Sequence, residues 1–447
     1  MQKRPDIIAA IATAPGRGGI GIVRISGFGL ERLSNTLTGR LLEPRVATYT
    51  PFFAADNSVL DQGIALYFPA PLSYTGEEVL ELQGHGGQGV LELVLQRCLA
   101  LGARLAQPGE FTERAFMNDK MDLAQAESVA DLIEATTQQA ARSAVRSLQG
   151  DFSNVIHSVV KRLIDLRMYV EATLDFPEEE GVVETDTHKL AAKIDAIQGE
   201  LRRIGELAKQ GSILREGAQV VLVGAPNVGK SSLMNRLAGE EVALVSDIAG
   251  TTRDAIRQVL QINGVPLHII DTAGLRETED VVERLGMERT QQNIERADLV
   301  LVLIDSANPN PAEIMPLLAR IPNHIPCLFV HNKIDLTQQV ARVIEEKGVT
   351  HLYLSAKADI GIEALRECVL QTIGWRQEAG VFMARTRHLV AIDRASEHLD
   401  AASQQLEAQE LLAEELRHAQ LALNQITGEF VADDLLGEIF SRFCIGK

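Results

Sequence analysis

The chain of 447 residues is long enough for about three domains, and its 46% apolar and 23% charged residues exclude a wholly disordered protein. Its net charge of −18 disfavours non-specific binding to nucleic acid, so any role on RNA must be local, transient or shared with a partner. No apolar run reaches the ~18 residues of a membrane span and no convincing signal peptide is present, so we expect a cytoplasmic protein without a membrane segment.

The N-terminal part, residues 1–118, is rich in glycine, proline and β-branched residues. Two of its segments, 20–26 and 79–83, predict strands between glycine-rich turns. Three charged residues in this part or just after it stand in otherwise apolar or turn-rich segments: Arg24, Glu81 and Lys120. They are weak candidates for a ligand site, and surface charge is the better interpretation from the residues alone.

A GxGxxG pattern at residues 84–89 follows one of these strands and is typical of dinucleotide sites. The acidic residue that should end the next strand is missing, because Pro108 and Gly109 interrupt that segment first. We therefore interpret the glycines as residues of tight turns. His85 is interpreted as a satisfied structural histidine.

Helical periodicity dominates residues 119–215 and 376–447, where apolar residues step by three and four between 156 and 170 and between 412 and 426. Strands and helices alternate over 216–375, the pattern of a doubly wound α/β domain. Because an apolar helix face is unstable in water, we expect the two helical parts to form one discontinuous domain with the α/β domain inserted into it. Two separate helical hairpins are the alternative.

A phosphate-binding loop is the strongest motif of the chain. The segment GAPNVGKS at 224–231 fits GxxxxGK[ST], follows the apolar strand 219–223 and precedes an apolar helix. Its backbone N–H groups and the helix N-terminus would surround the phosphates. Lys230 would supply a positive charge to the β- and γ-phosphates, and Ser231 a hydroxyl to Mg²⁺.

Two motifs are expected to contact the γ-phosphate and its metal. DTAG at 271–274 follows the strand 266–270. Its Asp271 is placed for the metal's outer shell, and Gly274 can donate its N–H to the γ-phosphate. DIAGTTRD at 247–254 has the threonines with which a switch loop closes on metal and phosphate.

Two further motifs predict which nucleotide base the site recognises. NKID at 332–335 follows the strand 327–330, and the carboxylate of Asp335 can accept hydrogens from guanine N1 and N2, a donor pair that adenine lacks. SAK at 355–357 closes the base pocket, and the order of the motifs indicates a GTP-binding domain of the translation-factor-like class. The predicted GTP-binding residues are Asn227, Val228, Gly229, Lys230, Ser231, Ser232, Ser246, Asp247, Ile248, Ala249, Gly250, Thr251, Thr252, Asp271, Thr272, Ala273, Gly274, Asn332, Lys333, Asp335, Ser355, Ala356 and Lys357.

One position departs from many GTPases, because Leu275 stands where a glutamine often orients the attacking water. Leucine cannot hydrogen-bond a water, so another group must stabilise the transition state. A monovalent cation held by the side-chain oxygen of Asn227 is one solution, and Arg253 or Arg276 as an arginine finger is the competing one. Glu283 is a candidate to position the water indirectly, although the pattern alone favours a solvated helix face.

Long segments resemble the MnmE (TrmE) family of tRNA-modification GTPases over the whole chain. They are PGRGG with GI and RISG, SYTGEEVLELQGHGG, PGEFTERAF with NDK and DLAQAE, DIAGTTRD, and the terminal DDLLG, IF and FCIGK. The resemblance implies an N-terminal α+β folate-binding domain at 1–118 that forms a homodimer, a discontinuous helical domain at 119–215 and 376–447, and an inserted P-loop GTPase domain at 216–375.

The resemblance also implies a reaction and its partners. With an FAD-dependent partner, MnmG (GidA), in a heterotetramer-like complex, the family installs a carboxymethylaminomethyl or aminomethyl group at C5 of the wobble uridine of certain tRNAs. The one-carbon unit comes from a tetrahydrofolate derivative, such as 5-formyl- or 5,10-methylene-tetrahydrofolate. A basic partner would let an acidic chain act on tRNA.

The resemblance further implies roles for individual residues. Folate would be held by Arg24, Glu81, Lys120 and Lys447. Potassium would be held by Asn227, Ser246, Ile248 and Thr251. Magnesium would be held by Ser231 and Thr252. The implied catalytic residues are Lys230, Thr252 and Glu283.

The four cysteines form no CxxC pair, which predicts neither a zinc site nor a disulfide framework. Cys444 lies near Lys447, where a nucleophilic role is open, but a buried inert thiol is the preferred interpretation.

Two other functional classes also stay open. A ribosome-assembly GTPase would bring a basic RNA module, which the acidic segment 385–447 does not resemble. A folate-dependent methyl transferase regulated by GTP is the second.

Overall fold

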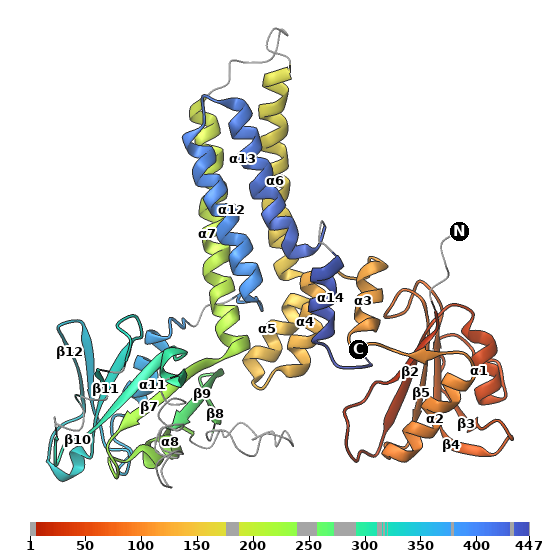
Figure 1. The fold of residues 1–447 in the computed structure, drawn as a ribbon, viewed down its shortest axis with the longest axis horizontal. Coiled ribbons are helices and arrows are strands. Elements are labelled where there is room, and N and C mark those ends of the chain that lie inside the picture. Colours follow the sequence, from red (N-terminus) through yellow and green to blue (C-terminus); the bar gives the residue numbers. More distant parts are fainter. Residues whose placement is uncertain are drawn as a thin grey trace. The chain divides into compact units, whose positions relative to one another are not determined.

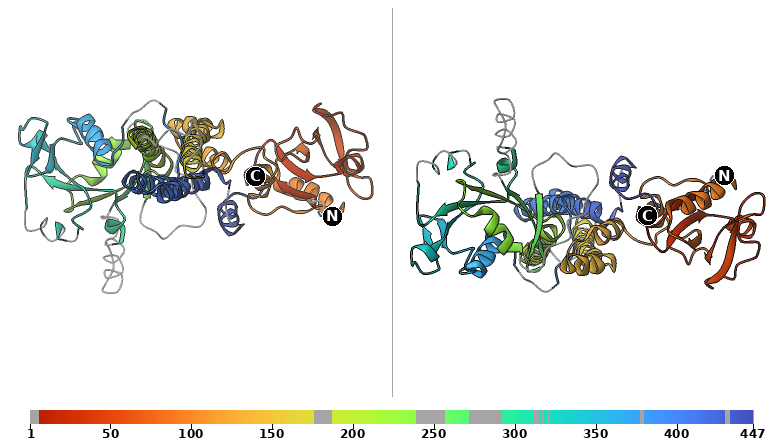
Figure 2. Two further views of the ribbon diagram at one scale, coloured as in Figure 1. Left: turned by 90° about the horizontal axis from the view of Figure 1, so that it is seen from above. Right: turned by 90° about the horizontal axis from the view of Figure 1, so that it is seen from below.

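The computed structural model describes residues 6–175, 187–238, 257–271, 292–310, 315, 318–319, 321–376, 380–429 and 433–446 (Figures 1 and 2). The chain forms two compact units. Unit 1 consists of residues 1–130, 148–160 and 420–447, and unit 2 of residues 131–147 and 161–419. The four-part division at residues 118, 215 and 375 stays a prediction.

Unit 1 contains a six-stranded sheet in the order β3-β4-β5-β2-β1-β6, in which only the β1–β6 pair is parallel. Its strands are β1 (Ile8–Ile11), β2 (Gly21–Gly27), β3 (Thr48–Phe53), β4 (Val59–Phe68), β5 (Glu78–Gly84) and β6 (Arg104–Leu105). Helices α1 (Leu30–Thr38) and α2 (Gln88–Ala100) pack on one face of this sheet, and the predicted α+β fold is confirmed (Figure 1).

Strand alternation separates the two faces of this sheet. Val23 and Ile25 of β2 are buried under α1 and α2, so Arg24 between them lies on the opposite face. The β2–β5 register places Arg24 directly across from Glu81. Helix α3 (Glu110–Met117) brings the buried Phe111 to the same face as Arg24.

Residues 85–87 form the short connection from β5, which ends at Gly84, to α2, which begins at Gln88, so the tight-turn interpretation applies to this three-residue segment. Gly86 is needed for close approach, because a Cβ there would lie 2.5 Å from the carbonyl oxygen of Gly18. The interpretation of His85 as a satisfied histidine is confirmed, since its Nδ1 lies 2.7 Å from Asp61 Oδ1. The ring is nevertheless exposed, so His85 belongs to the surface and not to the core.

Unit 2 contains a seven-stranded sheet in the order β12-β13-β11-β10-β7-β9-β8. Its strands are β7 (Ala218–Gly224), β8 (Arg257–Ile262), β9 (Val265–Asp271), β10 (Leu299–Asp305), β11 (Cys327–Asn332), β12 (Arg342–Glu346) and β13 (Val349–Tyr353). The five inner strands are parallel, and β8 and β12 at the edges are antiparallel.

Both faces of this sheet are buried, as a nearly continuous apolar strand requires. Val220 and Leu222 of β7 face one apolar cluster, and Val221 and Val223 face the other. Helices α8 (Lys230–Ala238) and α11 (Ile362–Thr372) contact each other. The predicted doubly wound, mostly parallel sheet is confirmed.

The remaining helices are α4 (Leu123–Glu134), α5 (Gln138–Leu148), α6 (Asp151–Asp175), α7 (Thr187–Glu216), α12 (Thr386–Gln404), α13 (Gln409–Thr427) and α14 (Asp433–Ser441). The predicted apolar faces of α6 and α13 are buried. Helices α7 and α12 lie side by side, and Gln198 donates to Asp400 across them at 2.8 Å (Figure 1). This contact favours one discontinuous helical domain over two separate hairpins.

Inside unit 2, polar contacts connect the ends of several helices to each other and to the β8–β9 hairpin. The carboxylate of Asp131, 3% exposed, lies 2.8 Å from both Arg215 at the end of α7 and Arg385 before α12. The hydroxyl of Thr137 donates to the carbonyl oxygen of Gly264 at the hairpin tip at 2.8 Å.

Among the described residues, no helix is both long and apolar enough to span a bilayer.

Candidate nucleotide-binding site

The predicted site residues of unit 2 gather where parallel strands end. The register pairs Leu222 of β7 with Asp271 of β9, and Asp305 of β10 with Asn332 of β11. Gly224, the first residue of the P-loop, ends β7 beside β10. Carboxyl ends of parallel strands are the usual ligand edge of such a sheet.

The P-loop backbone follows a path that needs two residues in the left-handed region. Asn227 has φ of 59°, and Gly229 has φ of 102°. A Cβ on Gly229 would lie 2.3 Å from Asn332 Nδ2, so only glycine fits there. Asn332, 2% exposed, donates from Nδ2 to the carbonyl oxygen of Val228 at 2.9 Å. The NKID motif thus fixes the P-loop directly.

Lys230 begins α8 and is almost fully buried. Its Nζ donates to the carbonyl oxygens of Gly224 at 2.6 Å and Ala225 at 3.0 Å, so the ammonium lies across the P-loop. Ser231 and Ser232 follow on the exposed first turn of α8. This turn combines a cation, hydroxyl groups and N-terminal backbone N–H groups, which together suit a phosphate with its magnesium ion.

The base-binding motifs form a connected hydrogen-bond network. Asn332 Oδ1 accepts from the backbone N–H of Ala356 at 3.0 Å. The carboxylate of Asp335, which is exposed, accepts from the buried Ser355 hydroxyl at 2.6 Å. Ser355 Oγ also accepts from the N–H of Ala358 at 3.1 Å. NKID and SAK, which are separate in the sequence, therefore act as one structural element.

Asp305 is a site residue that the sequence reasoning missed. Lys333 Nζ lies 2.7 Å from Asp305 Oδ2. Partial burial alone would raise the pKa of Asp305, but the hydrogen bond from Lys333 and the N–H of Ala307 hold this pKa below its ordinary value. The signal was present, because Asp305 ends an apolar strand at the same edge as the P-loop.

Several predicted residues lie outside the described part of the chain, and their assigned roles stay predictions. They are Ser246, Asp247, Ile248, Ala249, Gly250, Thr251, Thr252, Arg253, Thr272, Ala273, Gly274, Leu275, Arg276, Glu283 and Lys447. For Asp271 the described part includes the backbone only.

A second group of predicted residues comes together in unit 1. Arg24 and Glu81 form an ion pair at 2.9 Å, and the Arg24 guanidinium lies over the rings of Tyr74 and Phe111. A neighbouring pocket of about 370 Å³ is lined by both Glu81 and Lys120, together with apolar side chains from 68 to 79. Glu81 and Lys120, which looked like scattered surface charges, thus line one cavity, and Arg24 is joined to it through its ion pair with Glu81.

The C-terminal segment approaches the same sheet. Gly446 has φ of 98°, and a Cβ there would lie 2.4 Å from the carbonyl oxygen of Ile11, at the end of β1. Strand β1 pairs with β2, which carries Arg24. Cys444 is exposed, so the preference for a buried thiol is wrong.

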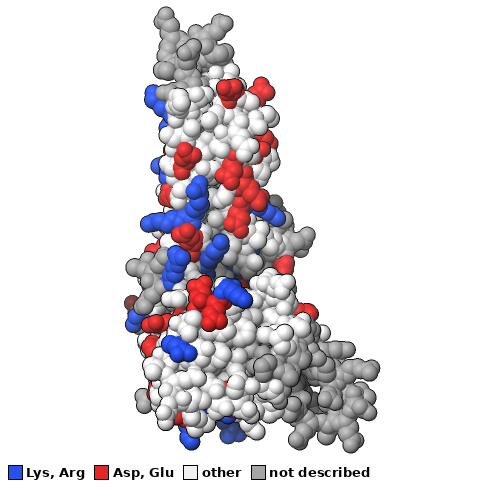
Figure 3. Space-filling model, turned by 90° about the vertical axis from the view of Figure 1, so that its left-hand side faces the viewer, with Lys and Arg blue, Asp and Glu red and all other residues white. Residues whose placement is uncertain are grey.

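Charge is mixed on the face of the molecule in Figure 3. Acidic and basic side chains of the described residues alternate along the helical part there and do not form one continuous basic surface. This distribution agrees with the net charge of −18.

Comparisons with known proteins cover the whole chain. A family model described as the MnmE helical domain matches residues 123–444, and one described as the N-terminus of the GTP-binding protein TrmE matches residues 7–120. The tRNA modification GTPase MnmE of Laribacter hongkongensis is 59% identical over 100% of this chain and 100% of its own length. The protein of that name from Nitrosomonas eutropha is 58% identical, again over 100% of both chains. A solved structure of Aquifex aeolicus Era bound to GDP and aluminium fluoride is 26% identical, with a TM-score of 0.28, over 40% of this chain and 66% of that one.

Proposed function

The chain belongs to the MnmE family of tRNA modification GTPases, and on this premise we propose that it couples GTP hydrolysis to modification of the wobble uridine. Full-length identity to these GTPases makes GTP binding and tRNA modification the function class. The observation that supports the GTP site best is the convergence of Lys230, Asn332 and Asp335 at one sheet edge. Family membership favours this function over ribosome assembly or a folate-dependent methyl transferase.

The residues of the site have separable tasks in hydrolysis. Lys230 places its positive charge beside the β- and γ-phosphates, where negative charge develops in the transition state. The backbone around Gly229 surrounds the phosphates, and Asp335 selects guanine. Ser231 together with Thr252 would hold Mg²⁺, a cation that prefers hydroxyl and phosphate oxygens and neutralises phosphate charge.

We expect deletion of this chain from its cell to remove the C5 substituent from wobble uridines of certain tRNAs. Wild-type protein should restore the modified nucleoside, and Lys230→Ala should not, because its GTPase rate falls by about 100-fold or more. Mass analysis of wobble nucleosides measures both outcomes. Full restoration by Lys230→Ala would separate modification from GTP hydrolysis.

We also propose that unit 1 binds a tetrahydrofolate derivative through Arg24, Glu81, Lys120 and Lys447. The donor set fits, because the 2-amino-4-oxo edge of a pterin presents two adjacent N–H donors that a carboxylate such as Glu81 can accept. Lys120 and Lys447 would face the carboxylates of the folate tail. When bound, the cofactor would supply the one-carbon unit, while Arg24 keeps the Glu81 carboxylate oriented.

Glu81→Gln should weaken folate binding by about tenfold or more, since an amide replaces an ionised acceptor of two donors. Deletion of Lys447 should weaken it through loss of one cation. Both variants should keep wild-type GTP affinity, because the GTP site belongs to unit 2. Calorimetry with 5-formyl-tetrahydrofolate and with GDP measures the two affinities of each variant. Normal folate binding by one of the variants would show that the residue it changes does not belong to the folate site.

The partners proposed for this activity are a second copy of the chain, the FAD-dependent protein MnmG and tRNA. A homodimer through the N-terminal domain and a heterotetramer-like complex with MnmG follow from the family resemblance. A partner with basic surface would complement the net charge of −18. The proposed compartment is the cytoplasm, and no membrane is required.

A further inference from the structure

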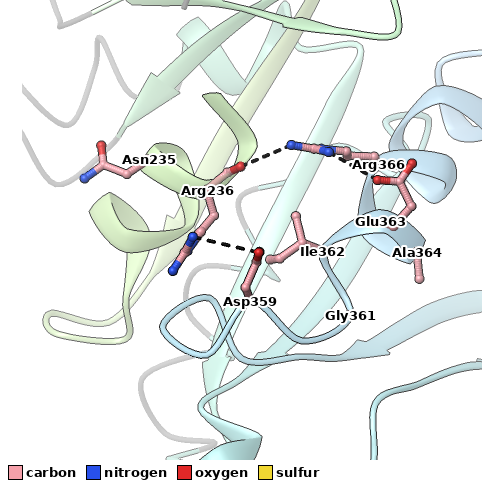
Figure 4. Close-up of a pocket in the computed structure, with 8 residues that line it drawn as sticks. All are labelled: Asn235, Arg236, Asp359, Gly361, Ile362, Glu363, Ala364 and Arg366. Atoms are coloured by element: carbon pink, nitrogen blue, oxygen red, sulfur yellow. Dashed lines mark hydrogen bonds and ion pairs between the residues drawn. The ribbon is translucent and has the colours of Figure 1, made fainter. Parts of the chain in front are cut away.

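A pocket of about 600 Å³ lies between α8 and α11, next to the SAK loop (Figure 4). Arg236 of α8 lines it and points toward Asp359, at 3.8 Å. Arg366 of α11 reaches the backbone oxygen of Arg236 at 3.4 Å, and its other contact is Glu363. The charged side chains of this pocket therefore form two pairs, Arg236 with Asp359 and Arg366 with Glu363.

The guanidinium of Arg236 also binds two consecutive backbone carbonyls of the SAK loop. Its Nε donates to Ala356 O at 3.0 Å, and its Nη2 donates to Lys357 O at 3.3 Å. A planar guanidinium presents several donors in a fixed geometry, which a lysine does not. Arg236 thus connects the helix that begins at the P-loop to the loop that closes the base pocket.

A continuous hydrogen-bond chain leads from Arg236 to the guanine-selecting carboxylate. The carbonyl of Lys357 and the N–H of Ala358 belong to one peptide unit and point in opposite directions. That N–H donates to Ser355 Oγ at 3.1 Å, and the Ser355 hydroxyl donates to Asp335 Oδ1 at 2.6 Å. Every donor in the chain points the same way, so each bond polarises and strengthens the next.

We propose that Arg236 is a positioning residue for guanine recognition, which it supports by fixing the orientation of the Asp335 carboxylate. Two-point reading of guanine N1 and N2 requires a fixed carboxylate plane, whereas one hydrogen bond tolerates rotation. Arg236 should therefore matter most for a base that offers both donors. This inference rests on the proposed guanine site.

The test is calorimetry with GDP and IDP, because hypoxanthine lacks the 2-amino group and offers only N1–H. Arg236→Ala should weaken GDP binding by about tenfold and IDP binding by about twofold, so the GDP preference falls by about fivefold. Arg236→Lys should give an intermediate preference, since it keeps the charge without the planar donor set.

Arg366→Ala is the matched control, because it removes the same charge from the same pocket but has no contact with the SAK carbonyls. Its GDP preference should stay within about twofold of wild type. Equal losses of GDP and IDP affinity in Arg236→Ala would overturn the proposal and indicate a merely structural residue. A wild-type chain without a GDP preference would instead overturn the guanine site itself.

Discussion

Asp335→Asn should convert the chain from a guanosine to a xanthosine nucleotide-binding protein. An ionised carboxylate accepts two hydrogens from guanine, and hydrogen bonds to a charged group contribute about 1.5–3 kcal/mol each. Losing both predicts a fall in GDP affinity of about 100-fold or more. Xanthine carries a carbonyl in place of the 2-amino group, so an asparagine amide can donate to it while its oxygen accepts N1–H.

The surroundings of Asp335 allow this substitution to change base recognition without disturbing the loop. The side chain is exposed and accepts from Ser355 Oγ at 2.6 Å, a bond that an asparagine oxygen can keep. The loop should therefore stay in place, and only the base-reading edge changes. The measurement is the affinity for GDP and XDP, with Glu345→Gln on the exposed edge strand β12 as a control for lost charge. Unchanged GDP affinity without a gain for XDP would contradict the role of Asp335.

The motifs predicted the fold of the GTPase part well, because each motif is a short local segment that directly follows an apolar strand. The strands that precede residues 224, 271 and 332 end together, as their apolar runs indicated. Contacts that depend on register were harder to foresee. Arg24 and Glu81 are 57 residues apart, and only the β2–β5 pairing shows that they face each other.

Residues without a motif were missed or misread for physical reasons. Arg236 lies on a helix with ordinary composition, and its role depends on backbone carbonyls more than 100 residues away. Exposure of a terminal residue such as Cys444 depends on how the segment docks, which periodicity does not report.

GTP hydrolysis by this chain should depend on potassium. Leu275 stands where a neutral, water-orienting glutamine is usual, so a different group has to stabilise the negative charge that spreads over the phosphate oxygens, and a cation is suited to this. Asn227 is exposed on the P-loop, and its amide oxygen is a hard ligand of the kind that alkali cations accept. At saturating GTP and equal ionic strength, we expect hydrolysis in potassium to be at least about tenfold faster than in sodium.

The backbone at Asn227 decides which variants test this idea. Its φ of 59° lies in the left-handed region, which asparagine and glycine tolerate better than alanine. Asn227→Gly therefore removes the side-chain oxygen without adding backbone strain. Asn227→Ala removes the oxygen and also strains the backbone. Both variants should lose potassium stimulation, and Asn227→Asp, which keeps an oxygen, should retain most of it.

An arginine finger makes the opposite prediction for the two salts. Loss of a guanidinium from Arg253 or Arg276 would slow hydrolysis by the same factor in potassium and in sodium, because its charge does not depend on the cation. If potassium supplies the charge instead, each arginine variant should hydrolyse GTP at close to the wild-type rate in both salts. Equal wild-type rates in both salts, or full stimulation in Asn227→Gly, would refute the potassium site and leave the arginines as the remaining source of positive charge.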